Sequence, residues 1–193
     1  AGFESYIVGG AVRDLLIEKN PKEYDICTSA TPNEINKIFK KSKLVGQSFG
    51  VSIVLQDKYA FEIATFREDF DYLDGRHPDK VKYTKNAEYD VKRRDFTVNG
   101  LLFDPIANKI IDYCDGLLDL KNKIIRTIGD PFERFSEDYL RILRAIRFSN
   151  QLNFEIEKKT SIAMDELSHK VVNISIERVR DEISKILLSL SPA

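Results

Sequence analysis

The sequence contains few of the features that mark a secreted, zinc-binding or membrane-spanning protein. Only two of its 193 residues are cysteines, Cys27 and Cys114, and they form no Cys-x-x-Cys or Cys/His group. A disulfide framework or a zinc site is therefore not expected, and a reducing cytoplasm is the predicted location. No apolar run approaches the length of about 20 residues that spans a bilayer, and residues 1–6 lack signal-peptide character.

An excess of charge of either sign is also absent. Lys and Arg together number 30 and Asp and Glu number 31, so any contact with nucleic acid must come from a local cluster of basic residues. No internal repeat or low-complexity segment is present. The hydrophobic content of 42% is enough for a proper core, and 193 residues are enough for one domain or two small ones.

The most informative stretch runs from Ile7 to Pro32. Apolar residues before Gly9 and Gly10, and apolar side chains at helical spacing after them, predict a strand, a glycine turn and a helix. Paired glycines let backbone N–H groups approach an anion, so a triphosphate can bind at such a turn with Arg13 beside it. The alternative is an ordinary tight turn.

A second strand is predicted to begin at Glu23. There Glu23, Tyr24 and Asp25 place two carboxylates on one face, about 6.5 Å apart along the chain. Two such carboxylates can hold a divalent metal, although an acidic pair also fits a solvated sheet edge. Glu62 lies in the middle of the predicted apolar strand 59–66, where its carboxylate fits either a solvated face or the same metal site.

The remaining pattern divides into strands followed by helices. Thr31 is predicted to cap a helix that begins at Pro32. Further predicted elements are strands at 50–55, 59–66, 109–113 and 124–128, a long polar loop at 67–80, and helices at 137–150, 155–167 and 175–190.

Four charged residues recur every third position in the predicted helix 137–150: Asp138, Arg141, Arg144 and Arg147. They form a slowly winding row whose guanidinium groups can face phosphates. Cytosine and adenine each present an amino donor beside a ring-nitrogen acceptor, so Asp138 as acceptor and Arg141 as donor fit both bases. Guanine and uracil would leave buried hydrogen bonds unmade. On an isolated helix, the same row would more often be a solvated face.

Together these motifs resemble the class II tRNA nucleotidyltransferase and bacterial poly(A) polymerase family. The likeness rests on Gly-Gly-x-Val-Arg-Asp at 9–14, the acidic-x-Asp strand at 23–25, Arg-Arg-Asp-Phe-Thr-x-Asn at 93–99 and Glu-Asp-x-x-Arg at 137–141, and it extends across nearly all of the chain. The resemblance implies an α+β fold. Its parts would be a polymerase-beta-like nucleotidyltransferase head with a mixed sheet at residues 1–128 and a small all-helical neck at residues 129–193.

The resemblance also implies template-independent addition of C and A residues, from CTP and ATP, to the 3′ end of tRNA. The implied catalytic residues are Glu23, Asp25 and Glu62, of which the first two bind Mg²⁺. The implied nucleotide-binding residues are Gly10, Arg13, Arg94, Asp138, Arg141, Arg144 and Arg147. Of two metal ions, one would lower the pKa of an RNA 3′-hydroxyl and the other would stabilise the pyrophosphate leaving group. Neither a membrane nor DNA is an expected partner.

Two features depart from the family pattern. Glu23 stands where the family has Asp, and its extra methylene moves the carboxylate by about one carbon–carbon bond, whereas metal sites tolerate only ~0.2 Å in ligand distance. Family members also continue with helical parts that grip the acceptor arm of tRNA, so the chain resembles a head and neck without them.

Several functions fit the resemblance. CCA addition is favoured because the polar segment Asp74–Pro78 resembles the flexible loop that family members carry after the metal strands. Poly(A) polymerase activity and partial addition of CC or A are close alternatives. A non-catalytic nucleotide-binding or RNA-binding module is an alternative from another class, and Glu23 is the feature that supports it.

Overall fold

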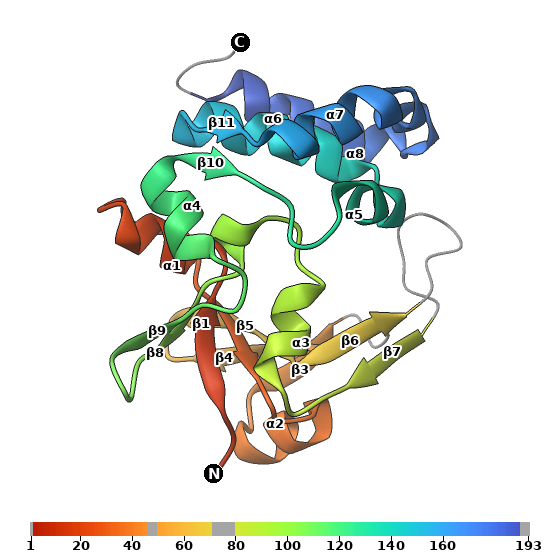
Figure 1. Cartoon of the computed structure of the whole chain (residues 1–193). Coiled ribbons are helices and arrows are strands. Elements are labelled where there is room, and N and C mark those ends of the chain that lie inside the picture. The colour runs from red at the N-terminus through yellow and green to blue at the C-terminus, as the bar shows by residue number, and fades with distance from the viewer. Residues whose placement is uncertain (1, 46–49, 71–79, 190–193) are drawn as a thin grey trace. The chain divides into compact units, whose positions relative to one another are not determined.

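The computed structural model describes residues 2–45, 50–70 and 80–189, which form two compact units (Figure 1). Among these residues, the first unit contains 2–45, 50–70, 80–94 and 99–114, and the second contains 95–98 and 115–189. Residues 115–128 therefore cluster with the second unit, although the family resemblance predicts that they belong to the head. The functional division at residue 128 stays a prediction.

A seven-stranded mixed sheet forms the centre of the first unit (Figure 1). Its strands lie in the order β3-β4-β5-β2-β1-β8-β9. Their bounds are β1 Ser5–Val8, β2 Asp25–Thr28, β3 Ser42–Val45, β4 Val51–Gln56, β5 Tyr59–Thr65, β8 Leu102–Asp104 and β9 Lys109–Ile111. Strands β2 and β5 pair in parallel, and the other neighbours pair antiparallel. The predicted mixed sheet and the predicted hairpin of β4 and β5 are confirmed.

A two-stranded antiparallel sheet replaces part of the predicted polar loop. Strand β6 spans Arg67–Phe70 and strand β7 spans Lys80–Tyr83. The loop prediction, which covered residues 67–80, was wrong for 67–70 and 80. Charged and apolar residues face each other in this pairing, for example Asp69 opposite Val81, so β6 lacks the apolar alternation that marks a strand. The segment Asp74–Pro78 lies outside the described residues.

Three short helices accompany the sheet: α1 Gly10–Leu16, α2 Pro32–Ile38 and α3 Ala87–Lys92. The start of α2 confirms the predicted cap, because the Glu34 carboxylate accepts hydrogen bonds from the backbone N–H of Thr31 at 2.8 Å and from its hydroxyl at 2.7 Å. Caps of this kind stabilise a helix by about 1 kcal/mol. The buried side chains around α2 and the sheet are Ala30, Ile35, Val54 and Ile63.

Helices dominate the second unit: α4 Gly116–Asn122, α5 Pro131–Glu137, α6 Leu140–Leu152, α7 Lys158–Leu167 and α8 Ile176–Leu187. Two-residue strands β10 (Ile124–Ile125) and β11 (Glu155–Ile156) pair in parallel, and a 3₁₀ helix spans Ser168–Asn173. A further 3₁₀ helix, Thr97–Asn99, begins in the second unit and ends with the first residue of 99–114. Helix α4 was not predicted. Its N-cap residue Asp115 has a left-handed backbone conformation with φ 59°. In the sequence, Asp115 followed by Gly116 predicts a turn and gives no signal for a helix start.

The predicted helix 137–150 is two helices in the structure. Helix α5 ends at Glu137, α6 begins at Leu140, and Asp138 between them is extended with φ −156° and ψ 103°. The Oδ1 atom of Asp138 accepts a hydrogen bond from the backbone N–H of Leu140 at 3.1 Å. This bond caps the start of α6 and holds Asp138 in an extended conformation, so the chain does not continue from α5 into α6 as one helix. Hydrophobic periodicity gives no sign of this break.

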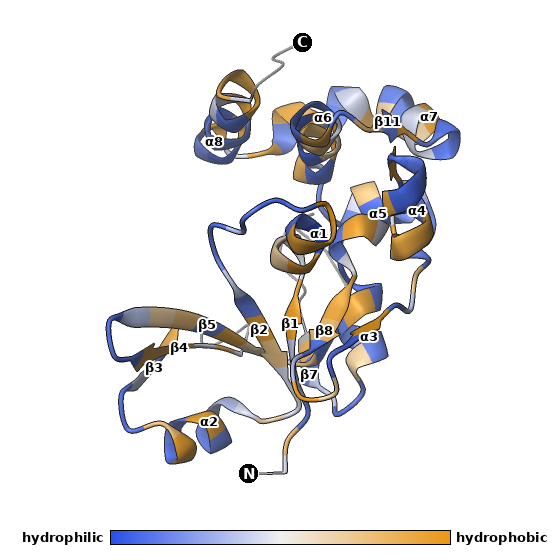
Figure 2. Ribbon diagram, turned by 90° about the vertical axis from the view of Figure 1, so that its left-hand side faces the viewer, coloured by the Kyte–Doolittle hydropathy of each residue, from blue (hydrophilic) through white to orange (hydrophobic). Residues whose placement is uncertain are grey.

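Hydrophobic side chains are buried inside each unit. In Figure 2, β1 and β8 are mostly hydrophobic, whereas α8 carries both hydrophobic and hydrophilic residues. Fully buried side chains of the first unit include Phe66, Leu101 and Leu102, and those of the second include Phe96, Ile125, Phe135 and Ala145. Each unit thus has a hydrophobic core of its own.

Candidate functional site

Two of the predicted catalytic carboxylates lie side by side on the sheet of the first unit. Asp25 is the first residue of β2, Glu62 lies in β5, and the two are register partners on these parallel strands. Register partners point to the same face, and neighbouring strands are about 4.8 Å apart. Both residues are exposed. The pair can therefore approach one cation from the solvent side of the sheet.

Glu23, the third predicted carboxylate, is not part of a strand. Strand β2 begins at Asp25, so the prediction that it begins at Glu23 was wrong, and Glu23 lies in an exposed irregular segment two residues earlier. In the part of the chain that the structure describes, no group of three or more His, Cys, Asp or Glu side chains is arranged to hold a metal ion. The assignment of Glu23 and Asp25 as metal ligands stays a prediction.

The electrostatic environment of Asp25 combines opposing effects. Although the residue is exposed, its neighbours desolvate the carboxyl and raise its pKa. The Arg94 guanidinium acts in the opposite direction, and the negative charge of Glu23 raises the pKa further. A cation near Asp25 would relieve the cost of ionising this carboxyl.

The glycine turn has the conformation that its sequence predicts. Gly9 has φ 76° and ψ −137°, which an L-residue with a side chain rarely adopts. Its backbone N–H donates to the Leu101 carbonyl at 3.2 Å, and a Cβ atom added to Gly9 would lie 3.7 Å from Nη1 of Arg94. The turn therefore places Gly9 close to Arg94, and Gly10 close to Arg13, because a Cβ atom added to Gly10 would lie 3.5 Å from Nη2 of Arg13.

Arg13 is more enclosed than the sequence suggested. It is only 7% exposed, and its Nε and Nη2 atoms donate to Oδ1 of Asp14 at 2.9 and 2.7 Å. Its Nη1 atom donates to Oδ1 of Asn99 at 2.6 Å. Asn99 was quoted in the sequence motif but was given no role. Its contact with Arg13 shows that the motif at residues 93–99 also orients an arginine from the first motif.

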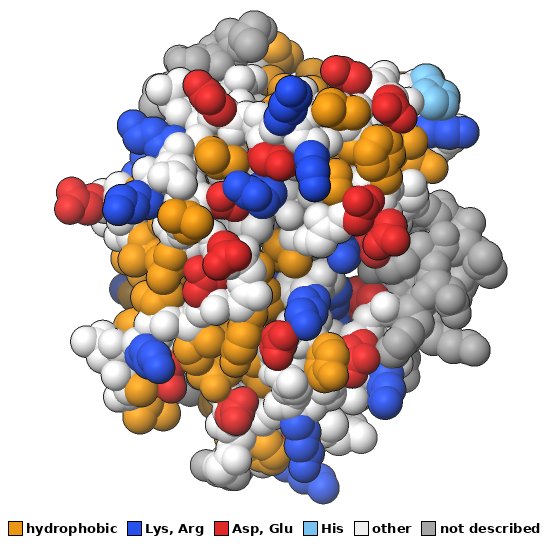
Figure 3. All heavy atoms as spheres, viewed as in Figure 1, with side chains coloured by type: hydrophobic (Ala, Val, Ile, Leu, Met, Phe, Trp, Pro, Cys, Tyr) orange, Lys and Arg blue, Asp and Glu red, His pale blue; other side chains and the backbone are white. Residues whose placement is uncertain are grey.

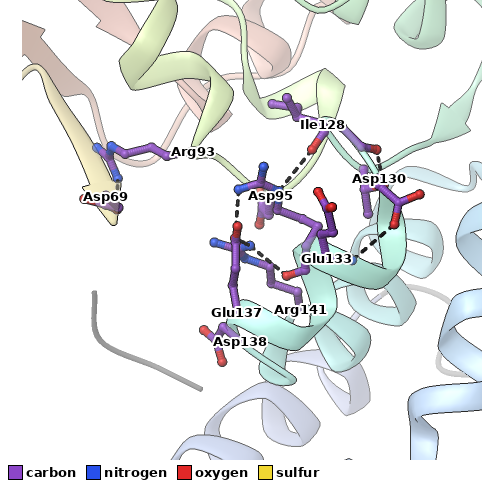
Figure 4. A network of polar contacts seen from close by, with 12 residues as sticks. Asp69, Arg93, Asp95, Ile128, Asp130, Glu133, Glu137, Asp138 and Arg141 are labelled. Atoms are coloured by element: carbon purple, nitrogen blue, oxygen red, sulfur yellow. Dashed lines mark hydrogen bonds and ion pairs between the residues drawn. The ribbon is translucent and has the colours of Figure 1, made fainter. Parts of the chain in front are cut away.

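The residues predicted to select the nucleotide belong to the second unit, and they do not form one continuous row on one helix. Asp138 precedes α6, and its carboxylate contacts Arg178, with Nη2–Oδ2 at 2.8 Å and Nη1–Oδ1 at 3.2 Å. Arg141 lies in α6 and donates to Oε2 of Glu137 at 2.5 Å and to the Arg134 carbonyl at 2.8 Å. Figure 4 shows Arg141 beside Glu137. Each member of the proposed base-reading pair thus has a protein partner.

The other two arginines of α6 also contact carboxylates of the second unit. Arg144 donates to Oδ2 of Asp95 from Nε at 2.7 Å and from Nη2 at 2.5 Å. Arg147 donates from Nε to Oε2 of Glu182 at 2.6 Å, and its guanidinium carbon lies 4.1 Å from the ring centre of Phe148. These contacts hold both arginines in defined positions.

Sequence reasoning missed most of these partners. Asp95 lies in a motif that was noted, but Arg178 and Glu182 were not singled out. Their spacing of four residues on the predicted helix 175–190 is a signal that places both on one face. Burial alone would raise the pKa of Glu182, but Arg147 and Lys185 outweigh that effect and lower it.

One face of the molecule carries side chains of both charges. Figure 3 shows acidic, basic and hydrophobic side chains interspersed over the face drawn. Within the described residues, no helix is both long enough and apolar enough to cross a lipid bilayer.

Comparison with protein families gives two matches. Residues 5–126 match the poly A polymerase head domain, and residues 153–193 match a probable RNA and SrmB-binding site of polymerase A. The first match alone covers more than half of the chain.

Individual relatives have a common description. The chain is 48% identical over 192 residues to the CCA-adding enzyme of Ligilactobacillus salivarius, covering 100% of this chain and 47% of that protein. It is structurally similar to the Bacillus stearothermophilus CCA-adding enzyme in complex with CTP, with a TM-score of 0.87 and 38% identity over 95% of this chain and 44% of that one. It is also similar to the Thermotoga maritima CCA-adding enzyme complexed with tRNA, with a TM-score of 0.78 and 28% identity over 98% and 44%. The chain spans about half the length of these relatives.

Proposed function

The chain belongs to the family of the poly A polymerase head domain and has its polymerase-beta-like nucleotidyltransferase fold, and on this premise we propose that it transfers C and A residues from CTP and ATP to the 3′ end of tRNA. Relatives that match nearly the whole chain are CCA-adding enzymes, and the solved structures of similar proteins include complexes with CTP, with tRNA, and with a primer tRNA and an ATP analogue. We propose the same partners for this protein.

The observation that carries the proposal is the register pairing of Asp25 and Glu62 on parallel strands. It supports a role for both carboxylates in holding a divalent cation, because Mg²⁺ usually binds one or two carboxylates together with substrate phosphates. CCA-adding enzymes use divalent metal ions. Glu23 would be a further ligand, reaching the site from the irregular segment before β2.

Bound Mg²⁺ ions would activate the RNA 3′-hydroxyl and stabilise the pyrophosphate leaving group. The residues of the chain would bind and orient the triphosphate around that chemistry. Gly10 would present its backbone to the triphosphate, with Arg13 beside it and Arg94 beside Gly9. Arg13 would contribute positive charge from a position that Asn99 and Asp14 already fix. An arginine held in place loses less side-chain entropy when it binds phosphate.

Base selection is the proposed role of Asp138 and Arg141. Asp138 would accept from the exocyclic amino group of cytosine or adenine, and Arg141 would donate to the neighbouring ring nitrogen. Arg144 and Arg147 would add positive charge along α6. Support comes from the motif Glu-Asp-x-x-Arg and from the ordered positions of these side chains in the second unit.

The test uses the intact protein and tRNA substrates that lack three, two or one of the nucleotides of the 3′-terminal CCA. We expect Mg²⁺-dependent addition of CCA, CA and A, respectively. Asp25→Asn should abolish transfer. Asp57→Asn, which removes the same charge from the exposed turn after β4, should leave it unchanged.

Other outcomes would redirect the assignment. Use of ATP on any RNA without use of CTP would indicate a poly(A) polymerase. Nucleotide binding without any Mg²⁺-dependent transfer would indicate a non-catalytic module and would refute the proposal.

A further inference from the structure

A buried carboxylate of the first unit has no role in the reaction as proposed so far. Asp90 lies in α3 and is 1% exposed. Its Oδ1 atom accepts from Nε and Nη2 of Arg93 at 2.9 and 2.7 Å and from the backbone N–H of Arg67 at 3.3 Å. Its Oδ2 atom accepts from Nη2 of Arg94 at 3.0 Å. One carboxylate thus contacts two consecutive arginines through its two oxygens.

The two arginines have different surroundings. Arg93 also approaches a second acid, with its Nη1 atom 3.7 Å from Oδ2 of Asp69. Figure 4 shows Arg93 directed toward Asp69. Arg94 instead extends toward the glycine turn, since its Nη1 atom lies 3.7 Å from the position of a Cβ atom on Gly9. Burial raises the pKa of Asp25, and the positive charge of Arg94 acts on that carboxyl in the opposite direction.

Burial argues against a purely incidental ion pair. An exposed ion pair three or four residues apart on a helix contributes little to folding stability. Burying a carboxylate removes its hydration, and well-placed charged donors must offset that cost. Asp90 has them: burial alone would raise its pKa, and Arg93 and Arg94 more than offset that effect and lower it. The carboxylate therefore stays ionised at neutral pH and provides a permanent acceptor for the Nη2 side of Arg94.

We propose that Asp90 is a positioning residue that holds Arg94 beside the Gly9–Gly10 turn, so that the guanidinium is oriented for the triphosphate of the incoming nucleotide. This inference rests on the proposed function, in which Arg94 binds that triphosphate. Asp90 itself does not touch the nucleotide. Its carboxylate limits the side-chain conformations of Arg94, so less entropy is lost when phosphate oxygens bind.

The test measures CTP binding and steady-state kinetics of the intact protein carrying Asp90→Asn. Loss of an oriented charged contact corresponds to an increase of about 10- to 100-fold in the Kd and KM for CTP, with kcat changed less than about threefold. A merely structural role would have a different signature, since a smaller folded fraction lowers the apparent kcat and leaves KM unchanged. The matched control is Asp69→Asn, which removes a charge from the same cluster of arginines and should leave KM for CTP unchanged.

A double-mutant cycle tests whether Asp90 acts through Arg94. In the Arg94→Gln background, adding Asp90→Asn should raise KM by less than about twofold. An equal increase of KM in both backgrounds, or a normal KM in folded Asp90→Asn protein, would overturn the proposal. If Asp90→Asn does not fold, Asp90→Glu keeps the charge while displacing it by one methylene, and it should also raise KM; a normal KM would overturn the proposal in that case.

The cycle also separates the two proposals. If the wild-type protein binds CTP but performs no transfer, the proposed function fails, and the CTP Kd values still decide the role of Asp90. If Arg94→Gln leaves the CTP Kd unchanged, both the nucleotide-binding role of Arg94 and the positioning role of Asp90 are wrong.

Discussion

The contact between Asp138 and Arg178 makes a quantitative prediction about the second unit. Two nitrogen–oxygen distances of 2.8 and 3.2 Å join the side chains, which are only 16% and 24% exposed. Asp138 additionally caps α6 through the backbone N–H of Leu140. Replacing Asp138 therefore removes two kinds of stabilisation, and the choice of substitution can separate them.

The magnitudes follow from these contacts. A hydrogen bond to a charged group contributes about 1.5–3 kcal/mol, and a helix cap contributes about 1 kcal/mol. Asp138→Ala loses both, so its free energy of unfolding should fall by about 2.5–4 kcal/mol. Asp138→Asn can still cap α6, so it should lose about 1 kcal/mol less.

Urea unfolding of the single and double variants with Arg178→Gln provides the assay. We expect a coupling energy of about 1–2 kcal/mol between the two positions. Arg180→Gln is the matched control on α8, because its side chain is 72% exposed, and it should change stability by less than about 0.5 kcal/mol. A coupling energy near zero, or equal losses in the Ala and Asn variants, would refute the reasoning.

Three further predictions concern base choice, metal binding and pH. Asp138→Ala should lower kcat/KM for CTP and ATP by about 10- to 150-fold and weaken discrimination against UTP and GTP. Arg144→Ala should lower kcat/KM for all four triphosphates more evenly. Equal losses for every base in Asp138→Ala would contradict the role of Asp138 in reading the base. Millimolar Mg²⁺, with nucleotide present, should raise the Tm of the wild-type protein, and the shift should disappear in Asp25→Asn; an unchanged shift in that variant would argue against Asp25 as a ligand. Glu182 has a pKa below its ordinary value of 4.5, because Arg147 outweighs the effect of burial, so its stabilisation is present above that pH and is lost as pH falls through the native pKa. Glu182→Gln should accordingly flatten the decline in urea-unfolding free energy in acid, and an unchanged decline would show that the pair contributes nothing.

Local signals in the sequence were sufficient for the parts of the fold that depend on neighbouring residues. The glycine turn before α1 follows from a backbone conformation that Gly9 can adopt, and the start of α2 follows from Thr31 and Glu34 three residues apart. The β4–β5 hairpin follows from its alternating pattern and short turn. In each case, the interacting groups lie within one short stretch of chain.

Contacts between distant segments could not be obtained in the same way. The partners of Asp138, Arg144 and Arg147 lie 40, 49 and 35 residues away. Helical periodicity can place these three charges near one surface, but it does not identify what each will contact. The break before α6 has the same origin, because a side chain that caps a helix cannot be distinguished by periodicity from one that continues it.

The contacts of Asp138 also determine how Arg178 should affect nucleotide binding. A carboxylate offers about four lone-pair positions, and three are used here, by the backbone N–H of Leu140 and by two nitrogens of Arg178. The remaining position on Oδ2 can accept one amino hydrogen of cytosine or adenine while the ion pair stays intact. Arg178 would then hold the acceptor in place instead of competing with the base. The Arg178→Gln variant should therefore bind CTP more weakly than the wild-type protein when both are folded, and tighter binding would mean that the ion pair must break before a base is read.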